Sequence, residues 1–433
     1  MIENTDYFLA VGALIECERI RQKKLASDHK PFNQESFCEH ICDTKTYRRM
    51  SVEKREINHR FYGQLLQRLG LQMAYDDELY KKLHVRLANL NDAITKYNLH
   101  DIEEIYGKIE NLIGDCHPDI YFQYIRWITT LLTNYYLHNQ FPSLEEMQVL
   151  LQICMGFPRD VRDMMMDLIF KYYRLHTTSN QDYFSYIKKF PYESSTFLPN
   201  RINYIQSIHD RDDFDQFTAL SNELIPILES TRNYFRLIDV YDLQITAMYY
   251  TDRIHVEDVI TKADNNVTSL FEKYKYKADM PIKKIEWPLK RKISQYTYHK
   301  GCILFLLKNY EQAIHILSEY LLNNQMMEVH SKVMLISCYH HLHQKIPSAY
   351  LELHHHTDDQ KFLNMHTYFQ MKYLHDEQLI TLNNYLEYEV LPLVMPEDDV
   401  LIRVLTYELS LNAKNNRGYV LFHHFFEKLG MTQ

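Results

Sequence analysis

Hydrophobic residues recur at intervals of three and four positions along most of the chain. From Leu71 onward this spacing is interrupted by polar or proline-containing segments, for example at 138–142, 210–213 and 395–399. Such an interval places apolar side chains on one face of an α-helix. The pattern therefore predicts about fourteen helices of ordinary length joined by short loops in residues 71–433, which is typical of stacked antiparallel helix pairs.

One segment of this region has the pattern of a tetratricopeptide repeat (TPR). In residues 298–317, Gly301 and Ala313 are the small residues, Tyr310 opens the second helix and Leu317 closes the core. Small residues at these places let the two helices of a repeat approach each other. We therefore expect a TPR-like α-solenoid over residues 71–433, with a concave surface lined by the first helix of each pair.

Composition favours helices throughout and excludes several kinds of site. The 433 residues include only 9 glycines and 12 prolines. No two glycines have the spacing of a dinucleotide-binding loop, a P-loop or a nucleophile elbow. The cysteines form no C-x-x-C unit, and the histidines at 340–343 and 354–356 form no H-E-x-x-H motif. We therefore predict an all-α protein that is not an enzyme and that has no metal or cofactor.

Charge is distributed unevenly. The whole chain has a net charge of −9, but residues 44–60 contain six Lys or Arg against two Glu. A basic stretch of this kind is expected at a nucleic-acid contact and also on a solvated helix face. The odd number of dispersed cysteines, the acidic N-terminus and the absence of a long apolar run predict a cytoplasmic protein with no membrane contact.

The first seventy residues predict four helices separated by tight turns, at 11–24, 34–39, 45–50 and 60–69. Asn33 is suited to cap the second helix, and Asp43 or Thr44 to cap the third. His40 lies where the chain must turn, and histidine tolerates a left-handed backbone. Gly70 is expected to end the fourth helix.

Residues 32–50 resemble the phage-repressor-type (XRE) helix-turn-helix, and more narrowly the version in Rgg/PlcR-like peptide-responsive transcription regulators. The resemblance covers about forty residues without a gap. The places that the family pattern defines are filled here by Gln34, Phe37, Cys38, Ile41, Cys42, Tyr47, Arg49 and Met50.

This resemblance implies a λ-repressor-like DNA-binding domain over residues 1–70, with residues 45–50 as the recognition helix. Short polar side chains and arginine on such a helix reach base edges and phosphates of double-stranded DNA. The residues that the resemblance assigns to DNA binding, together with the basic residues that follow them, are Gln34, Thr44, Lys45, Thr46, Tyr47, Arg48, Arg49, Lys54 and Arg55.

The same resemblance implies that residues 71–433 sense a short signalling peptide, as in quorum sensing, and form a homodimer. In the family, Asn and Arg hold the peptide backbone while aromatic pockets take its side chains. The candidates on predicted inner helices are Asn203, Tyr204, Asn233, Arg236 and Tyr241.

A second interpretation stays open. His40 replaces the turn glycine of the family, and Ser51 and Glu53 stand where the family has Glu and then Gly. In this interpretation the helix-turn-helix has lost DNA binding, and the chain is a TPR-type receptor or adaptor that binds another protein.

Overall fold

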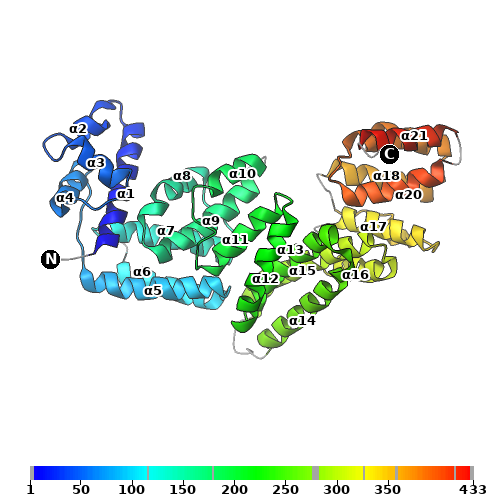
Figure 1. Cartoon of the computed structure of the whole chain (residues 1–433), viewed down its shortest axis with the longest axis horizontal. Helices are drawn as coiled ribbons and strands as arrows, with labels where there is room; N and C mark the ends of the chain where they lie inside the picture. The colour runs from blue at the N-terminus through cyan, green and yellow to red at the C-terminus, as the bar shows by residue number, and fades with distance from the viewer. Residues whose placement is uncertain are drawn as a thin grey trace. The chain divides into compact units, whose positions relative to one another are not determined.

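The computed structural model describes residues 4–114, 117–177, 180–275, 282–324, 327–355, 359–413 and 416–429. Within these ranges the chain is all-α, as predicted, and its one β-type contact is an isolated bridge between Gln72 and Asp119 (Figure 1). None of the helices in the described ranges has both the length and the apolar composition that crossing a bilayer requires.

The helices form two compact units that meet in the sequence near residue 220. The first unit extends to Leu220, and residues 281–285 group with it; the second contains the rest of the chain. The predicted domain boundary at residue 70 therefore lies within the first unit.

The first seventy residues form four α-helices, and Figure 1 shows them grouped together at the blue end of the chain. They are α1 (Thr5–Leu25), α2 (Gln34–Cys38), α3 (Thr44–Ser51) and α4 (His59–Arg68), with a 3₁₀ turn at Lys30–Phe32. All four predicted helices are thus confirmed. The first begins earlier than predicted because the Asn4 side chain caps it by accepting a hydrogen bond from the Tyr7 backbone N–H.

Three predicted turn features are confirmed. His40 has a backbone φ of 62°, and Gly70 has a φ of 70° directly after α4 and Leu69. Asp43 caps α3, since its carboxylate accepts a hydrogen bond from the Thr46 backbone N–H at 2.7 Å. Asn33 stands at the start of α2 but caps nothing there; its side chain instead accepts a hydrogen bond from Lys23 at 2.7 Å.

Seven further helices complete the first unit, and their apolar faces join those of α1–α4 in a single core that extends from Tyr7 to Phe197. They are α5 (Asp77–Thr95), α6 (Leu99–Ile113), α7 (Ile120–His138), α8 (Leu144–Ile153), α9 (Arg159–His176), α10 (Asn180–Ile187) and α11 (Leu198–His209).

Helix α1 is the element that joins the first seventy residues to this body. It contacts α7, α8 and the 3₁₀ turn η2 (Cys154–Gly156). A Cβ atom on Gly156 would lie 2.5 Å from the Cβ of Ala13, so η2 can pack this closely against α1 because residue 156 has no side chain. The Tyr7 hydroxyl donates a 2.6 Å hydrogen bond to Asp119, which is fully buried.

The remaining helices lie in the second unit or begin at its boundary. They are α12 (Phe214–Ser230), α13 (Tyr234–Thr251), α14 (Val256–Lys275), α15 (Ile282–Leu306), α16 (Tyr310–Asn323), α17 (Glu328–His341), α18 (Gln360–Tyr373), α19 (Leu379–Tyr385), α20 (Asp399–Asn412) and α21 (Asn416–Lys428). The described residues after position 70 thus hold seventeen α-helices, against the fourteen or so predicted.

Within residues 298–317, the predicted start of the second helix and the predicted core positions are confirmed. Helix α16 begins at Tyr310, and Ala313 and Leu317 are fully buried. A Cβ atom on Gly301 would lie 2.5 Å from a methyl group of Leu317. The absence of a side chain at Gly301 therefore sets the close approach of α15 and α16.

Candidate functional site

One side of α3 is anchored in the core. Tyr47 and Met50 are almost completely buried, and Met50 packs over Gly12 of α1. The Tyr47 hydroxyl donates a hydrogen bond to Glu16, which also pairs with Arg19 at 2.7 Å. Burial, together with the negative charge of Glu16, raises the pKa of Tyr47 far above its ordinary value. Tyr47 therefore fixes α3 to α1, which corrects its prediction as a DNA contact.

The opposite side of α3 faces water and is cationic. Lys45, Arg48 and Arg49 are exposed, and none of them forms an ion pair with any residue in the described ranges. Thr44 and Thr46 are half-buried, and the Thr46 hydroxyl donates to the Asp43 carboxylate at 3.0 Å. The structure thus places six of the nine predicted residues on one short helix, Tyr47 on its buried side and the other five away from the core.

The other three predicted DNA contacts lie near α3 in the sequence but differ in their surroundings. Gln34 is half-buried at the start of α2. The Lys54 ammonium donates a 2.7 Å hydrogen bond to the Ser51 carbonyl, and burial lowers the pKa of Lys54. Arg55 is exposed and lies 3.4 Å from the Glu53 carboxylate. The Lys54 ammonium is therefore bound to a carbonyl at the C-terminal end of α3, whereas Arg55 is at the surface.

The cations of α3 differ from other surface cations in the same unit. On α5, Lys81 pairs with Asp77 at 2.6 Å, and Lys82 pairs with Glu78 at 3.3 Å. Pairs four residues apart on a helix are the ordinary way in which exposed lysines are compensated. Since α3 itself contains no Asp or Glu, its positive charge is available to an external anion.

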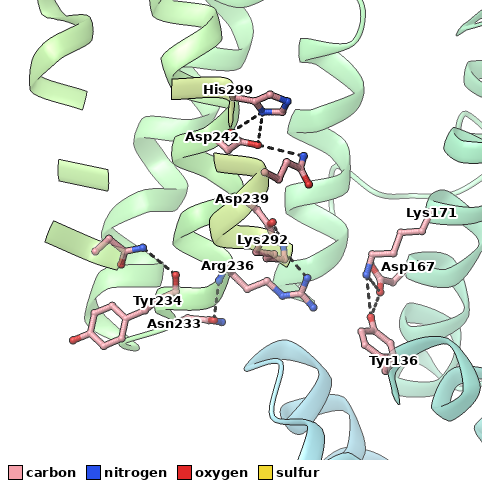
Figure 2. A network of polar contacts seen from close by, with 12 residues as sticks. Tyr136, Asp167, Lys171, Asn233, Tyr234, Arg236, Asp239, Asp242, Lys292 and His299 are labelled. Carbon is pink, nitrogen blue, oxygen red and sulfur yellow. Dashed lines mark hydrogen bonds and ion pairs between the residues drawn. The ribbon is translucent and has the colours of Figure 1, made fainter. Parts of the chain in front are cut away.

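Two of the predicted peptide contacts lie on α11 in the first unit. Asn203 is 3% exposed, and its side-chain amide donates a 2.8 Å hydrogen bond to Asp167. Figure 2 shows that the Asp167 carboxylate also accepts hydrogen bonds from the Lys171 ammonium, at 2.6 Å, and from the Tyr136 hydroxyl. Asn203 therefore serves a buried polar cluster, which corrects its prediction as a peptide contact. Tyr204, by contrast, is half-buried and lines a cavity.

The other three predicted peptide contacts lie on α13 in the second unit and are all buried. The Asn233 side chain caps the helix by accepting from the Arg236 backbone N–H, and the Arg236 guanidinium lies 3.7 Å from Asp239 (Figure 2). The Tyr241 hydroxyl donates to Glu229 at 3.1 Å, and burial raises the pKa of Tyr241 to about 12. These positions have internal partners, so we do not place a ligand on them.

The histidine-rich segments also have internal partners. His340 lies 2.7 Å from the fully buried Glu408. His354 and His355 lie 3.1 and 2.9 Å from Glu328, and His356 is outside the described residues. These histidines therefore contact buried carboxylates of the same chain.

Sequence reasoning missed two features of the first unit. His100, Asp101 and Glu104 bring ligand atoms within 4.8 Å of one another on the first turns of α6, but the group is mostly exposed. The cavity beside Tyr204 is the second feature. Spacing along α6 could have revealed the first; no sequence signal marks the cavity, since its walls come from several segments.

Comparisons of the chain with protein-family models, with curated proteins and with solved structures found no match.

Proposed function

We propose that this protein is a transcription regulator that binds double-stranded DNA through α3 and senses a small ligand through the helical body that follows. The observation that carries the proposal is the two-sided character of α3. Tyr47 and Met50 hold one side rigidly, while Lys45, Arg48 and Arg49 project from the other without ion pairs to described residues.

The arrangement of α2 and α3 supports a helix-turn-helix. The two helices are joined by a short turn in which His40 takes the left-handed conformation that the family usually gives to glycine. Asp43 then starts α3 with a capped N-terminus, and the N-terminal part of a recognition helix is the part that approaches bases. On this proposal Arg48 and Arg49 contact the duplex, and Thr44 and Lys45 lie at the leading end.

A single helix-turn-helix covers too little DNA to define a site. Regulators of this class bind as two-fold dimers that occupy half-sites about one helical turn apart. We therefore propose a homodimer whose helical body couples a signal, such as a short peptide, to the spacing of the two α3 helices. For such coupling the ligand must bind one dimer arrangement more tightly than the other.

The proposal is tested by electrophoretic retardation of a duplex that carries the region upstream of the gene. We expect wild-type protein to retard this duplex, and Arg48→Ala combined with Arg49→Ala to abolish retardation while the helical circular dichroism is unchanged. The matched control is Lys81→Ala combined with Lys82→Ala, which removes two exposed cations of α5 that already have acidic partners. Equal loss in both double variants would contradict a specific role for α3.

Salt dependence gives a second measure of the same proposal. If about four phosphates are neutralised per protomer, the affinity of the dimer falls with salt with a log–log slope of roughly −7. The double variant of α3 should have a much shallower slope. A flat wild-type response would favour the alternative function, a protein-binding receptor or adaptor.

A further inference from the structure

The first unit contains a cavity of about 460 Å³ beside Tyr204. Its lining comes from α9, α10, α11 and the segment between α10 and α11. Phe170, Phe184, Phe190, Tyr192 and Tyr204 supply aromatic surface. A cavity of this size that combines aromatic walls with polar and charged groups can bind a small molecule.

The walls are held in place by contacts that do not depend on a ligand. The Tyr192 hydroxyl donates a 2.7 Å hydrogen bond to the Met166 carbonyl, and its ring meets Phe170 edge-to-face at 5.7 Å. Tyr192 is 4% exposed and Phe190 is 8% exposed. The segment after α10 is therefore pinned to α9 by its aromatic side chains, and a site formed in advance loses less conformational entropy when it binds.

Two cations line the same cavity. Lys188 is exposed and forms no ion pair with a residue in the described ranges. The Arg211 guanidinium lies over the Phe184 ring at 5.5 Å, and its Nε donates to the Ser207 carbonyl at 3.1 Å. That carbonyl fixes the orientation of the guanidinium, while its two terminal nitrogens make no hydrogen bond to a described residue. Glu193 is the one acid in the lining, so the cavity carries a net positive charge.

We propose that this cavity binds a carboxylate that is attached to an aromatic or branched apolar group. The apolar group packs against the aromatic walls, and Lys188 and Arg211 attract the carboxylate. Arginine recognises carboxylates with paired hydrogen bonds, and lysine adds a point charge. This inference rests on the proposed sensing function, and it moves the ligand site from the buried residues of α13 to the wall that contains Tyr204.

Two kinds of ligand carry a carboxylate next to an apolar group: a short peptide, at its C-terminal end, and a free aromatic acid. Calorimetric titration of the full-length protein with 4-phenylbutyrate and with the tripeptide Ala-Leu-Phe covers both. The controls are 4-phenylbutanamide and the C-terminally amidated tripeptide, which lack the carboxylate. We expect at least one acid to bind at least tenfold more tightly than its amide. The tighter of the two acids identifies the source.

Variants locate the site. Lys188→Gln and Arg211→Gln should each weaken binding of the acid at least threefold, and Ser194→Trp, which fills the cavity from its rim, should abolish it. The matched control is Lys189→Gln, because Lys189 follows Lys188 directly but lies over the Tyr186 ring and does not line the cavity. Unchanged helical circular dichroism shows that each variant folds.

Several outcomes would overturn the inference: no heat with either acid, equal binding of acid and amide, or wild-type affinity in both Lys188→Gln and Arg211→Gln. The titrations contain no DNA, so they separate this inference from the proposed function. Binding of the acid by a protein that fails to retard DNA would leave the cavity assigned and the regulator proposal contradicted. Retardation of DNA by a protein that binds neither acid would support the regulator proposal and contradict the assignment of the cavity.

Discussion

Helices α3 and α13 use the same residue types for opposite purposes. Each begins with a side chain that accepts a hydrogen bond from a backbone N–H three residues ahead, Asp43 in α3 and Asn233 in α13. Each then presents arginine. Arg236 of α13 is 3% exposed and faces Asp239, whereas Arg48 and Arg49 of α3 face water. Arg236 is thus held inside the fold beside an acid, whereas Arg48 and Arg49 have no acidic partner among the described residues.

The largest expected effect tests the buried side of this comparison. Arg236→Ala removes a buried cation and leaves Asp239 with Lys292 as its remaining cation in Figure 2. Loss of this buried side chain should cost about 3 kcal/mol, because its packing inside the fold and its contact with Asp239 are removed together. Urea unfolding followed by circular dichroism measures the change. A decrease in the free energy of unfolding of less than about 1 kcal/mol would mean that Arg236 does not stabilise the fold, and Arg236 would again be a candidate ligand contact.

Glu328 of α17 is expected to have the next largest effect. It is 5% exposed and accepts from Lys332 at 2.7 Å and from His354 and His355. Glu328→Gln should lower the free energy of unfolding by about 2 kcal/mol at neutral pH, since charged hydrogen bonds are lost in a buried site.

Acid titration distinguishes the charge of Glu328 from its packing. Burial alone would raise the pKa of Glu328, but the hydrogen bonds from Lys332, His355 and His354 outweigh it and lower the pKa to about 2. A lowered carboxyl pKa contributes stability above the unfolded value, and this contribution disappears as the pH falls toward the folded value. The difference between wild type and Glu328→Gln should therefore shrink between about pH 4.5 and pH 2. A constant difference would contradict an ionic role.

Tyr47→Phe tests the anchored side of α3. The substitution keeps the buried ring and removes the hydroxyl that donates to Glu16. Loss of one buried hydrogen bond should cost about 1 kcal/mol, measured by urea unfolding. DNA retardation should persist at the same protein concentration. Loss of retardation in a stably folded Tyr47→Phe would show that the hydroxyl, although buried here, acts on the duplex.

The smallest expected effect on stability belongs to the exposed cations. Arg48→Ala combined with Arg49→Ala should change the free energy of unfolding by less than about 0.5 kcal/mol, because exposed side chains without partners contribute little to folding. The same double variant should lose DNA retardation. A large loss of stability would indicate that these arginines, like Arg236, have a structural partner, and the contrast between α3 and α13 would fail.

Features that depend on neighbouring residues were predictable from the sequence. The Asp43 cap, the left-handed turn at His40 and the end of α4 at Gly70 each follow from one residue type at one place. The close approach at Gly301 followed from its spacing to Ala313. The exposure of Lys45, Arg48 and Arg49 on α3 agrees with their prediction as contacts, but the burial of Tyr47 on the same helix was not predicted.

Features that depend on distant contacts were not predictable. The resemblance makes Asn233 a candidate ligand contact, yet in the structure it caps α13, a position at which asparagine is favoured. Asn203 does lie inside a helix, and its partner Asp167 is 36 residues away in the sequence. The cavity beside Tyr204 is formed by residues from 170 to 211, and no local pattern reports which aromatic rings surround a space.

The contact between Gly156 and Ala13 limits how a signal can travel through the first unit. Gly156 meets the methyl group of Ala13, and neither residue has a side-chain rotamer that could change to absorb a movement. We therefore expect a displacement of η2 to move α1, to which α3 is attached through Tyr47 and Met50. In the proposed dimer, the separation of the two cationic helices would then follow from the conformation of the whole first unit.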